Sequence, residues 1–541
     1  MILHTLDAYI QKHMESFHTP GASVAVTDQS ETLWEREYGF RDLESRQPVC
    51  SETRFQLGSI TKTFTAFALM QLYDRGEFDP QRSITDYLPW LELPEGGDGI
   101  TGHQLLTHTS GLPLVRDDIP SSPYMARIVR ECLLVDEPGN AYHQSEIGFQ
   151  ILWCVLERLS GEPYHEFITQ NILIPLGMMN TKAKITHDSR RELAIGYQYF
   201  YDDRPHHSSY GLVAAPWFEY LAGDGCIVST AGDMAIFLRM LLNRGAMSSG
   251  ERLIAEETLD LMMEPYAKRY ENAYYGYGSY VRRMDGHKVI GHGGDMPGFQ
   301  TMMLGDVDLG VGAVVCINGP GSPFFPFYTV NYALALLRAE MEGHRAPKEP
   351  ALPERQHIGN ARDYAGQYYG ADRHIQVSQE EGHLILLFGE DAWPLEKQGE
   401  DTLISNHPEF SLYPLHFVRD QSGKVIELEH GVDVYYAGAY PEDVSVSCPD
   451  EWQSFEGHYR MYSPWTPANF RVVLRRGKLF LVDPGNISYG GYEDELYPLE
   501  PGVFRVGSDD SPDILEFADV LDGVALRACL SGSWHYRASM E

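Results

Sequence analysis

The sequence predicts a chain of several domains, in which a large N-terminal domain precedes two small antiparallel β-barrels. Three observations support this prediction: the length of 541 residues, a proline-rich segment at 346–353, and a change in character beyond that segment. Three prolines stand within seven residues there, as in a semi-rigid linker. We therefore expect domains at residues 1–345, 354–445 and 446–541, joined by a linker at 346–353.

The region after the linker combines short alternating strands, closely spaced turn residues and many aromatic side chains. This pattern is typical of small antiparallel barrels. The region also repeats itself, since three short motifs recur in the same order: Gly366-Gln367-Tyr368, Gly382–Leu387 and Pro394-Leu395 return as Gly457-His458-Tyr459, Gly477–Val482 and Pro498-Leu499. Such a repeat predicts two related barrels.

The N-terminal domain carries a serine and a lysine three residues apart at the predicted start of a helix. Ser59 and Lys62 lead directly into the apolar stretch Phe64–Leu72. Positions i and i+3 share one helix face, so the Lys62 amine can lie beside the Ser59 hydroxyl and take its proton. The free amide groups of a helix N-terminus favour negative charge developing on Ser59. By itself, however, a Ser-x-x-Lys spelling also arises by chance, with a solvated lysine.

Longer motifs in the same order favour the catalytic interpretation. Gln56–Lys62 resembles the active-site helix of the serine β-lactamase and penicillin-binding-protein superfamily. Leu105–Pro113 resembles the "LLTHTSGLP" signature of the branch that contains class C β-lactamases, DD-peptidases, D-aminopeptidases and related esterases. Further landmarks of that branch resemble three segments: Ile174–Met178, Ala222–Met234 and Gly291–Phe299. Together the resemblance covers about residues 10–335.

The resemblance implies a fold and an activity. The expected catalytic domain is α/β, with an antiparallel sheet flanked by helices and an all-helical insertion from about Thr101 to Leu221. A Ser-x-x-Lys domain followed by two lipocalin-like barrels is similar to the three-domain D-aminopeptidases, and the peptidases of linearised microcystin are relatives of about this size and class. The implied function is hydrolysis of amide or peptide bonds through an acyl-Ser59 intermediate, on short or unusual linear peptides, with the choice between D- and L-residues left open.

A glycine-rich strand supplies the second part of the expected site. Gly293 and Gly294 let a substrate backbone approach closely, and the imidazole of His292 can donate to a substrate carbonyl or carboxylate. The same spelling is also typical of a glycine-rich hairpin with an exposed histidine. The resemblance implies that the backbone N–H groups of Ser59 and Asp295 hold the oxyanion of the reaction.

The third catalytic element departs from the family pattern, which is Tyr-x-Asn. Alignment without gaps from Gly139 and from Phe149 places Gln144 and Glu146 at these two positions, with Tyr142 two residues early. Three interpretations stay open: Tyr142 acts after a local backbone shift, Glu146 accepts the proton instead, or the general base is lost. We favour Tyr142, although its position also suits a core aromatic. Gln144 itself cannot titrate.

Composition excludes several function classes. With 42 Lys and Arg against 77 Asp and Glu, the formal charge is −35, which repels nucleic acids and anionic membranes. No apolar run approaches the roughly 20 residues of a membrane helix. A His-Glu-x-x-His spacing is absent, so we expect no metal or other cofactor. The seven cysteines are scattered and odd in number, and the first ten residues do not spell a secretory signal. We therefore expect a cytoplasmic protein.

The sequence thus predicts a serine hydrolase whose partner is a small peptide or amide, with its oligomeric state undetermined. An esterase or a β-lactamase-like hydrolase is the alternative within enzyme chemistry. A catalytically impaired protein that binds peptides is the alternative outside it, and the glutamine and glutamate at positions 144 and 146 favour that alternative.

Overall fold

The computed structural model describes residues 2–114, 122–321, 325–352, 355–441, 447–461, 468–485, 490–508, 511 and 513–538. These residues form two compact units. The first unit runs to Gln198 and resumes over Ala214–Pro350, and the second contains Tyr199–Val213 together with the chain from Ala351. The predicted end of the linker at Pro353 and the predicted boundary at 445/446 lie outside the described residues.

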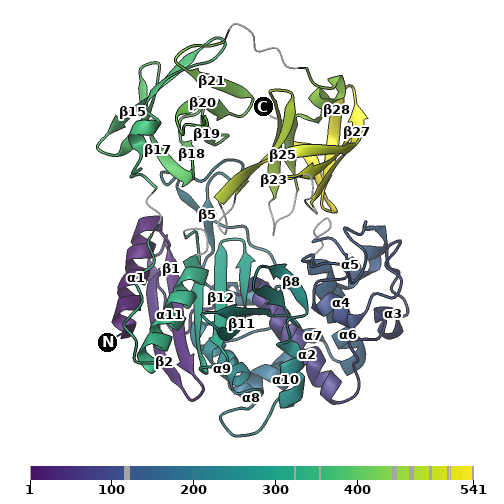
Figure 1. Ribbon diagram of the computed structural model, residues 1–541. Helices are drawn as coiled ribbons and strands as arrows, with labels where there is room; N and C mark the ends of the chain where they lie inside the picture. The colour runs from purple at the N-terminus through teal and green to yellow at the C-terminus, as the bar shows by residue number, and fades with distance from the viewer. Residues whose placement is uncertain are drawn as a thin grey trace. The chain divides into compact units, whose positions relative to one another are not determined.

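A nine-stranded antiparallel sheet forms the centre of the first unit (Figure 1). Its strand order is β3-β2-β1-β13-β12-β11-β10-β9-β8. The bounds are β1 Gly21–Asp28, β2 Thr32–Asp42, β3 Gln47–Pro48, β8 Ala267–Tyr270, β9 Ala273–Tyr275, β10 Tyr280–Met284, β11 His287–Met296, β12 Phe299–Asp306 and β13 Val311–Ile317. Because β1 pairs with β13, the two ends of the first unit meet inside one sheet.

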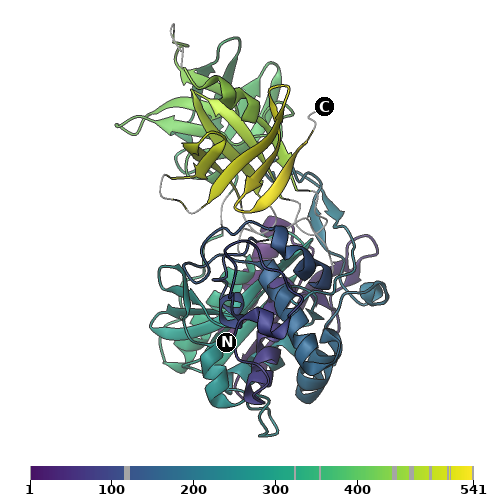
Figure 2. The same cartoon turned by 90° about the vertical axis from the view of Figure 1, so that its right-hand side faces the viewer.

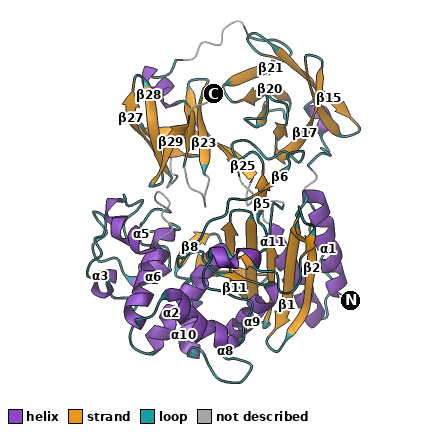
Figure 3. Ribbon diagram, turned by 180° about the vertical axis from the view of Figure 1, so that it is seen from behind, coloured by secondary structure: helices purple, strands orange, loops and turns teal. Residues whose placement is uncertain are grey.

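Helices cover both faces of this sheet, as the opposite views of Figures 1 and 3 show. Their bounds are α1 Ile2–Phe17, α2 Thr61–Asp74, α3 Ile84–Tyr87, α4 Gly102–Leu106, α5 Ser122–Ile128, α6 Glu146–Ser160, α7 Tyr164–Ile168, α8 Ile174–Leu176, α9 Ala231–Leu242, α10 Glu256–Met262 and α11 Phe325–Met341. α1 packs on α11, which packs on β12 and β13, whereas α9 packs on β1 and β13. Gly312 permits the approach of α9, since a Cβ there would lie 2.4 Å from the Leu238 side chain.

Helix α2 is buried around its whole circumference. Every residue from Thr61 to Leu72 is buried, including Lys62. Most residues from Phe64 to Leu72 are apolar, as expected of a helix in a protein core. The burial of α2 removes the Lys62 side chain from water, so the partners of its amine must be other protein groups.

The expected all-helical insertion from Thr101 to Leu221 is helical only in its first part. Helices α4 to α8 lie there, but the later part forms short strands, and β5 (Tyr197–Tyr199) pairs with β6 (Leu212–Ala214). A further short pair joins β4 (Phe55–Gln56) to β7 (Val228–Ser229). The expectation of an all-helical insertion is therefore wrong beyond α8.

Residues 199–213, here called the strap, explain this difference. Their polar side chains find partners in the barrels: Arg471 forms an ion pair with Asp203, and Ser208 donates to the buried carboxylate of Glu396. The strap therefore belongs to the second unit although its chain neighbours belong to the first. The predicted first domain at 1–345 is accordingly not one continuous compact unit.

The second unit contains two closed eight-stranded antiparallel barrels, as predicted (Figure 2). The strands of the first are β14 Gly366–Tyr369, β15 His374–Glu380, β16 His383–Phe388, β17 Asp391–Gly399, β18 Thr402–Ser405, β19 Leu415–Arg419, β20 Val425–His430 and β21 Asp433–Ala437. Those of the second are β22 Gly457–Arg460, β23 Asn469–Arg475, β24 Lys478–Gly485, β25 Gly490–Glu500, β26 Val503–Val506, β27 Ile514–Leu521, β28 Val524–Leu530 and β29 Ser533–Ala538.

The sequence repeat corresponds to equivalent positions in the two barrels. Gly382 and Gly477 both occupy the left-handed region, at φ values of 86° and 71°, in the turn between the second and third strands. Tyr368 and Tyr459, on the first strand of each barrel, both donate to a backbone carbonyl four residues earlier. None of the described helices is long and apolar enough to cross a membrane.

Candidate active site

The nucleophile candidate stands at the junction of a short 3-10 helix, Gly58–Ile60, and α2. Gly58 has a φ of 53°, a conformation that favours glycine, and it turns the chain from β4 into the helix. The Thr61 hydroxyl accepts from the backbone N–H of Ile227, and Leu57 N–H donates to the Ile227 carbonyl. These contacts fix the helix start, and Ser59 stays partly exposed there.

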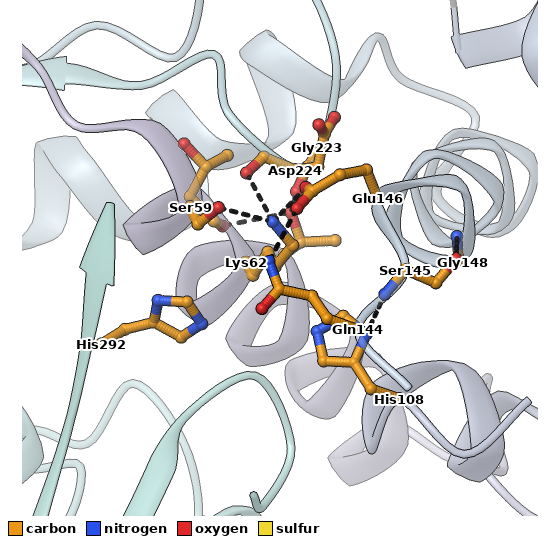
Figure 4. Close-up of polar contacts among 12 residues, drawn as sticks. Ser59, Lys62, His108, Gln144, Ser145, Glu146, Gly148, Gly223, Asp224 and His292 are labelled. Atoms are coloured by element: carbon orange, nitrogen blue, oxygen red, sulfur yellow. Dashed lines mark hydrogen bonds and ion pairs between the residues drawn. The ribbon is translucent and has the colours of Figure 1, made fainter. Parts of the chain in front are cut away.

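Lys62 has three acceptors around its amine (Figure 4). Its Nζ lies 2.8 Å from Ser59 Oγ and 3.3 Å from the Asp224 carbonyl oxygen, and it forms an ion pair with Glu146. The Lys62 side chain is fully buried and that of Glu146 is 16% exposed. The i, i+3 spacing therefore brings the serine and the lysine together as the sequence predicts, and the structure adds a carboxylate to them.

The segment Leu105–Pro113, which begins in the last turn of α4, positions that carboxylate. His108, in a left-handed conformation with φ of 58°, accepts from the Ser145 N–H through Nδ1 at 3.1 Å. Ser145 caps α6, since its hydroxyl accepts from Gly148 N–H at 3.2 Å and donates to the Pro113 carbonyl at 2.8 Å. Through these bonds to Ser145, the segment Leu105–Pro113 fixes the position of Glu146, the first residue of α6, beside Lys62.

Gln144 and Tyr142 lie at increasing distance from the amine. Gln144 Nε2 donates to Glu146 Oε1 at 3.0 Å, and the Tyr142 hydroxyl lies 3.5 Å from Gln144 Oε1. Among the described residues, Tyr142 has no hydrogen bond to Lys62, and desolvation raises the pKa of its phenol. The structure brings Glu146 to the lysine, whereas Tyr142 is connected to it only through Gln144 and Glu146.

Asp224 is a second buried carboxyl at the site, and motif reasoning did not single it out. Burial and then the nearby charge of Glu146 raise its pKa to about 7. The Tyr220 hydroxyl donates to Asp224 Oδ2 at 2.7 Å, while Lys62 bonds to the main-chain carbonyl of the same residue. A carboxyl with this pKa is about half ionised at pH 7 and carries little negative charge only at lower pH. Its position within the landmark Ala222–Met234 was the sequence signal available.

Strand β11 brings two backbone amides together beside Ser59. A Cβ at Gly294 would lie 1.9 Å from the Leu57 oxygen and 2.9 Å from the Ser59 nitrogen, and a Cβ at Gly58 would lie 2.7 Å from the Asp295 nitrogen. The two chain segments therefore touch through their backbones. This proximity of the Ser59 and Asp295 amides is what an oxyanion hole requires.

His292 lies on the same strand but both of its ring nitrogens have protein partners. Nδ1 donates to the Gly293 carbonyl, and Nε2 accepts from the Tyr275 hydroxyl at 2.8 Å. Burial lowers the pKa of the imidazole to about 3, with Lys62 as the next cause. His292 is therefore neutral and held in one tautomer, and it lies apart from the lysine network in Figure 4.

Within the described residues, no group of three or more His, Cys, Asp or Glu side chains is placed to hold a metal ion. The groups that converge on Ser59 are an amine, a carboxylate, a carboxyl and two amides. This set can move a proton from a hydroxyl and stabilise an oxyanion.

Comparison with known proteins gives consistent matches. A family model described as Beta-lactamase matches residues 6–337. The chain is 24% identical over 326 residues to Protein flp of Staphylococcus aureus, a match that covers 58% of this chain and 62% of that protein. It is 24% identical over 409 residues to Penicillin-binding protein 4* of Bacillus subtilis, covering 70% and 87%. The chain therefore spans less than two thirds of the length of the first of these relatives.

Two solved structures match the fold, and the first of them covers more of the chain than the first unit. An octameric penicillin-binding protein homologue from Pyrococcus abyssi is 25% identical with a TM-score of 0.58, and the match covers 80% of this chain and 100% of that one. A penicillin binding protein from Bacillus halodurans is also 25% identical, with a TM-score of 0.51 and coverage of 61% and 98%.

Proposed function

Because the chain belongs to the Beta-lactamase family, whose members are serine hydrolases, we propose that it cleaves amide or peptide bonds of short peptides through an acyl-Ser59 intermediate. The observation that carries the proposal is the contact of Ser59 Oγ with a fully buried lysine that is paired to a carboxylate. Such a nucleophile with an adjacent base is the arrangement that acyl transfer requires.

The proton route begins with the Lys62 and Glu146 pair. Transfer of one proton from the ammonium to the carboxylate leaves a neutral amine, which takes the Ser59 proton as Oγ bonds to the substrate carbonyl carbon. The tetrahedral intermediate then expels the substrate amine, which receives that proton from Lys62. Water, deprotonated by the same pair, attacks the ester and releases the acid, and Ser59 recovers its proton.

Glu146 is the proposed second base, in place of the tyrosine we favoured on sequence grounds. Glu146 forms an ion pair with Lys62, whereas Tyr142 reaches only Gln144. Desolvation also raises the pKa of the Tyr142 phenol, which disfavours the phenolate that would accept a proton. Gln144 orients the carboxylate through its bond to Oε1.

The oxyanion and the substrate complete the proposal. The amides of Ser59 and Asp295 hold the developing negative charge, and Gly293 and Gly294 admit the substrate backbone. His292 has a structural role in strand β11, because both of its ring nitrogens already bond to the protein, to the Gly293 carbonyl and the Tyr275 hydroxyl. Two relatives are named for penicillin, itself an amide, which supports amide chemistry at this serine.

Peptides with D-residues and a cytoplasmic location belong to the same proposal. The first rests on the likeness to D-aminopeptidases, and the second on the scattered, odd number of cysteines. Neither is needed for the chemistry at Ser59. Esterase or β-lactamase activity is the alternative within the same mechanism.

A protein that binds peptides without turnover is the second candidate function. The specific observation in its favour is the ion pair itself, because the carboxylate of Glu146 engages the amine that would have to take the Ser59 proton. The two candidates differ in whether Ser59 forms a covalent bond.

Covalent labelling decides between them. The protein is incubated with a fluorophosphonate and, separately, with a fluorescent penicillin, and the adduct is mapped by mass spectrometry, with Ser59→Ala as the control. We expect an adduct on Ser59 that the variant lacks. Absence of any Ser59 adduct with both probes contradicts the hydrolase and favours the binding protein.

A further inference from the structure

A cavity of about 330 Å³ lies in the second unit, and all the described residues that line it belong to that unit. Its walls come from the turn 370–373 between β14 and β15, from the start of β21, and from the turn between β23 and β24. The pairing of β14 with β21 puts the first two segments at the same end of the first barrel (Figure 1). Barrel mouths are common ligand sites, and the volume is at the lower end of the range for small-molecule pockets, about 300–1,000 Å³.

Contacts between the two barrels hold the cavity open before any ligand binds. Arg475, at the end of β23, is 3% exposed, donates to the Gly431 carbonyl at 2.8 Å and forms an ion pair with Glu429 at 3.0 Å. The next residue, Arg476, lines the cavity and forms an ion pair with Glu427. The turn of the second barrel is therefore fixed against the first barrel, so the cavity is preformed and a ligand need not order its walls.

The charges that line the cavity disfavour an ionic ligand. Arg373 forms ion pairs with Asp433 at 2.6 Å and Glu409 at 2.8 Å, so an anion would compete with carboxylates that are already in place. The formal charge of −35 opposes an anion further. A cation would meet two guanidiniums, because that of Arg476 lies 5.5 Å from the Tyr436 ring centre and that of Arg373 lies 5.9 Å from the Tyr435 ring centre. A neutral ligand is therefore favoured.

The surfaces of the cavity combine aromatic rings with hydrogen-bonding groups. The rings of Tyr436 and Tyr440 meet at 84° with centroids 5.6 Å apart, and Tyr440 is 40% exposed. The Asp433 carboxylate is 43% exposed and accepts from Arg373 and from the Tyr435 hydroxyl. A carboxylate accepts about four hydrogen bonds, so these two donors leave capacity for the hydroxyl groups of a ligand. Rings offer a flat apolar face, and carboxylate and guanidinium groups bind paired hydroxyls.

We propose that this cavity binds a neutral carbohydrate, a mono- or disaccharide or the end of a longer glycan. The apolar face of a sugar ring packs on Tyr436 and Tyr440, and its hydroxyls bond to Asp433 and to the guanidinium groups. A purely apolar ligand would leave those polar groups without water or partner. The first barrel offers no internal site for such a ligand, because Ile375, Leu386 and Leu428 fill its core. The proposal is independent of hydrolysis at Ser59.

The test uses the full chain and ligand-observed saturation-transfer NMR, with dissociation constants from titrations. The probes are four neutral disaccharides, namely maltose, cellobiose, lactose and N,N′-diacetylchitobiose, together with glucose, glucosamine and glucose 6-phosphate. The variants are Tyr436→Ala and Tyr440→Ala, which remove the rings, and Val432→Trp, which adds bulk at an exposed position of the cavity wall. Tyr536→Ala is the matched control, because Tyr536 is 37% exposed on the second barrel and does not line the cavity. Thermal unfolding checks that each variant is folded.

We expect at least one neutral disaccharide to bind with a millimolar or lower dissociation constant. Tyr436→Ala and Tyr440→Ala should each weaken that binding at least about fivefold, because each removes a ring face. Val432→Trp should weaken it too, and Tyr536→Ala should leave it unchanged. Glucosamine and glucose 6-phosphate should bind no more tightly than glucose, since the cavity has no unmatched charge to offer them.

Three results would overturn the proposal. The first is that none of the four disaccharides binds, and the second is that folded tyrosine variants bind them as the wild type does. The third is tighter binding of either charged sugar than of glucose, which would reject a neutral ligand. Ser59→Ala should bind the disaccharide normally. Loss of binding in that variant would assign the sugar to the candidate active site and also overturn the proposal, whereas labelling of Ser59 tests the hydrolase separately.

Discussion

Replacing Glu146 by glutamine is the sharpest test of the proton route. Glutamine keeps an oxygen that can accept from Lys62 but cannot take a proton. General bases contribute about 10²- to 10⁴-fold to a rate, so acylation of Ser59 should slow by that factor, or about 3–5 kcal/mol in activation free energy. Tyr142→Phe is the matched control, because it removes only a 3.5 Å contact to Gln144 and keeps the ring beside Arg269.

Glu146→Gln should lower the free energy of unfolding by less than the loss of a buried ion pair usually does. Breaking a buried ion pair costs about 3–5 kcal/mol when the remaining charge has no partner. Here the Glu146 side chain is 16% exposed, and its charge is one cause of the raised pKa of Asp224. With Glu146 neutral, Asp224 ionises more readily and replaces part of the lost attraction. We therefore expect the free energy of unfolding to fall by only about 1–3 kcal/mol.

The assay is the time course of fluorophosphonate labelling between pH 6 and 9, read by mass spectrometry of the intact protein, with urea unfolding in parallel. The wild type, Glu146→Gln and Tyr142→Phe are compared at equal probe concentration. If Glu146→Gln labels within threefold of the wild-type rate, Glu146 is not the second base. If Tyr142→Phe is the slower variant, the tyrosine interpretation is correct and the one proposed from the structure is wrong.

Three further substitutions test the surroundings of Ser59. Gly294→Ala should slow fluorophosphonate labelling at least about tenfold, because its Cβ would lie 1.9 Å from the Leu57 backbone oxygen. Gly293→Ala is the control: its Cβ meets only the flexible end of the Met302 side chain, so this variant should label at the wild-type rate. Equal labelling rates for the two variants would contradict the close approach of β11 to the Leu57–Ser59 backbone. Asp224→Asn should gain stability relative to the wild type as pH rises from about 4 to 7. In that window the native carboxyl, with its pKa raised to about 7, keeps a proton that the unfolded chain has lost, so the free energy of unfolding of the wild type falls by up to about 1.4 kcal/mol per pH unit. Parallel pH profiles of urea unfolding for the two proteins would refute this. Ser145→Ala loses the N-terminal cap of α6, so the free energy of unfolding measured in urea should fall by about 1 kcal/mol and labelling of Ser59 should slow. A destabilised variant that labels at the wild-type rate would show that the cap does not position Glu146.

The sequence predicts the parts of this site that local geometry determines. Ser59 and Lys62 follow from the i, i+3 spacing at a helix start, and their 2.8 Å contact is as expected. The two barrels follow from a repeat whose members fall on equivalent strands. Alignment from both flanks also put Glu146 at the asparagine position, and the structure brings that residue to the amine.

Other parts depend on tertiary contacts that no local pattern encodes. Asp224 reaches the site because β7 pairs with β4, and its pKa depends on burial that spacing does not reveal. The strap has the composition of a loop, and only its ion pairs with the barrels show that it belongs to the second unit.

The charges around Ser59 explain how two carboxyl groups can lie near one lysine that is paired with only one of them. If both were ionised, the oxyanion of the tetrahedral intermediate would form beside two negative charges and one positive charge. Burial and the charge of Glu146 raise the pKa of Asp224 to about 7, so that below neutral pH Asp224 is largely protonated and the lysine and a single carboxylate balance each other. His292, with a pKa near 3, contributes no charge. The negative charge that forms during the reaction is then met by the two backbone amides of Ser59 and Asp295.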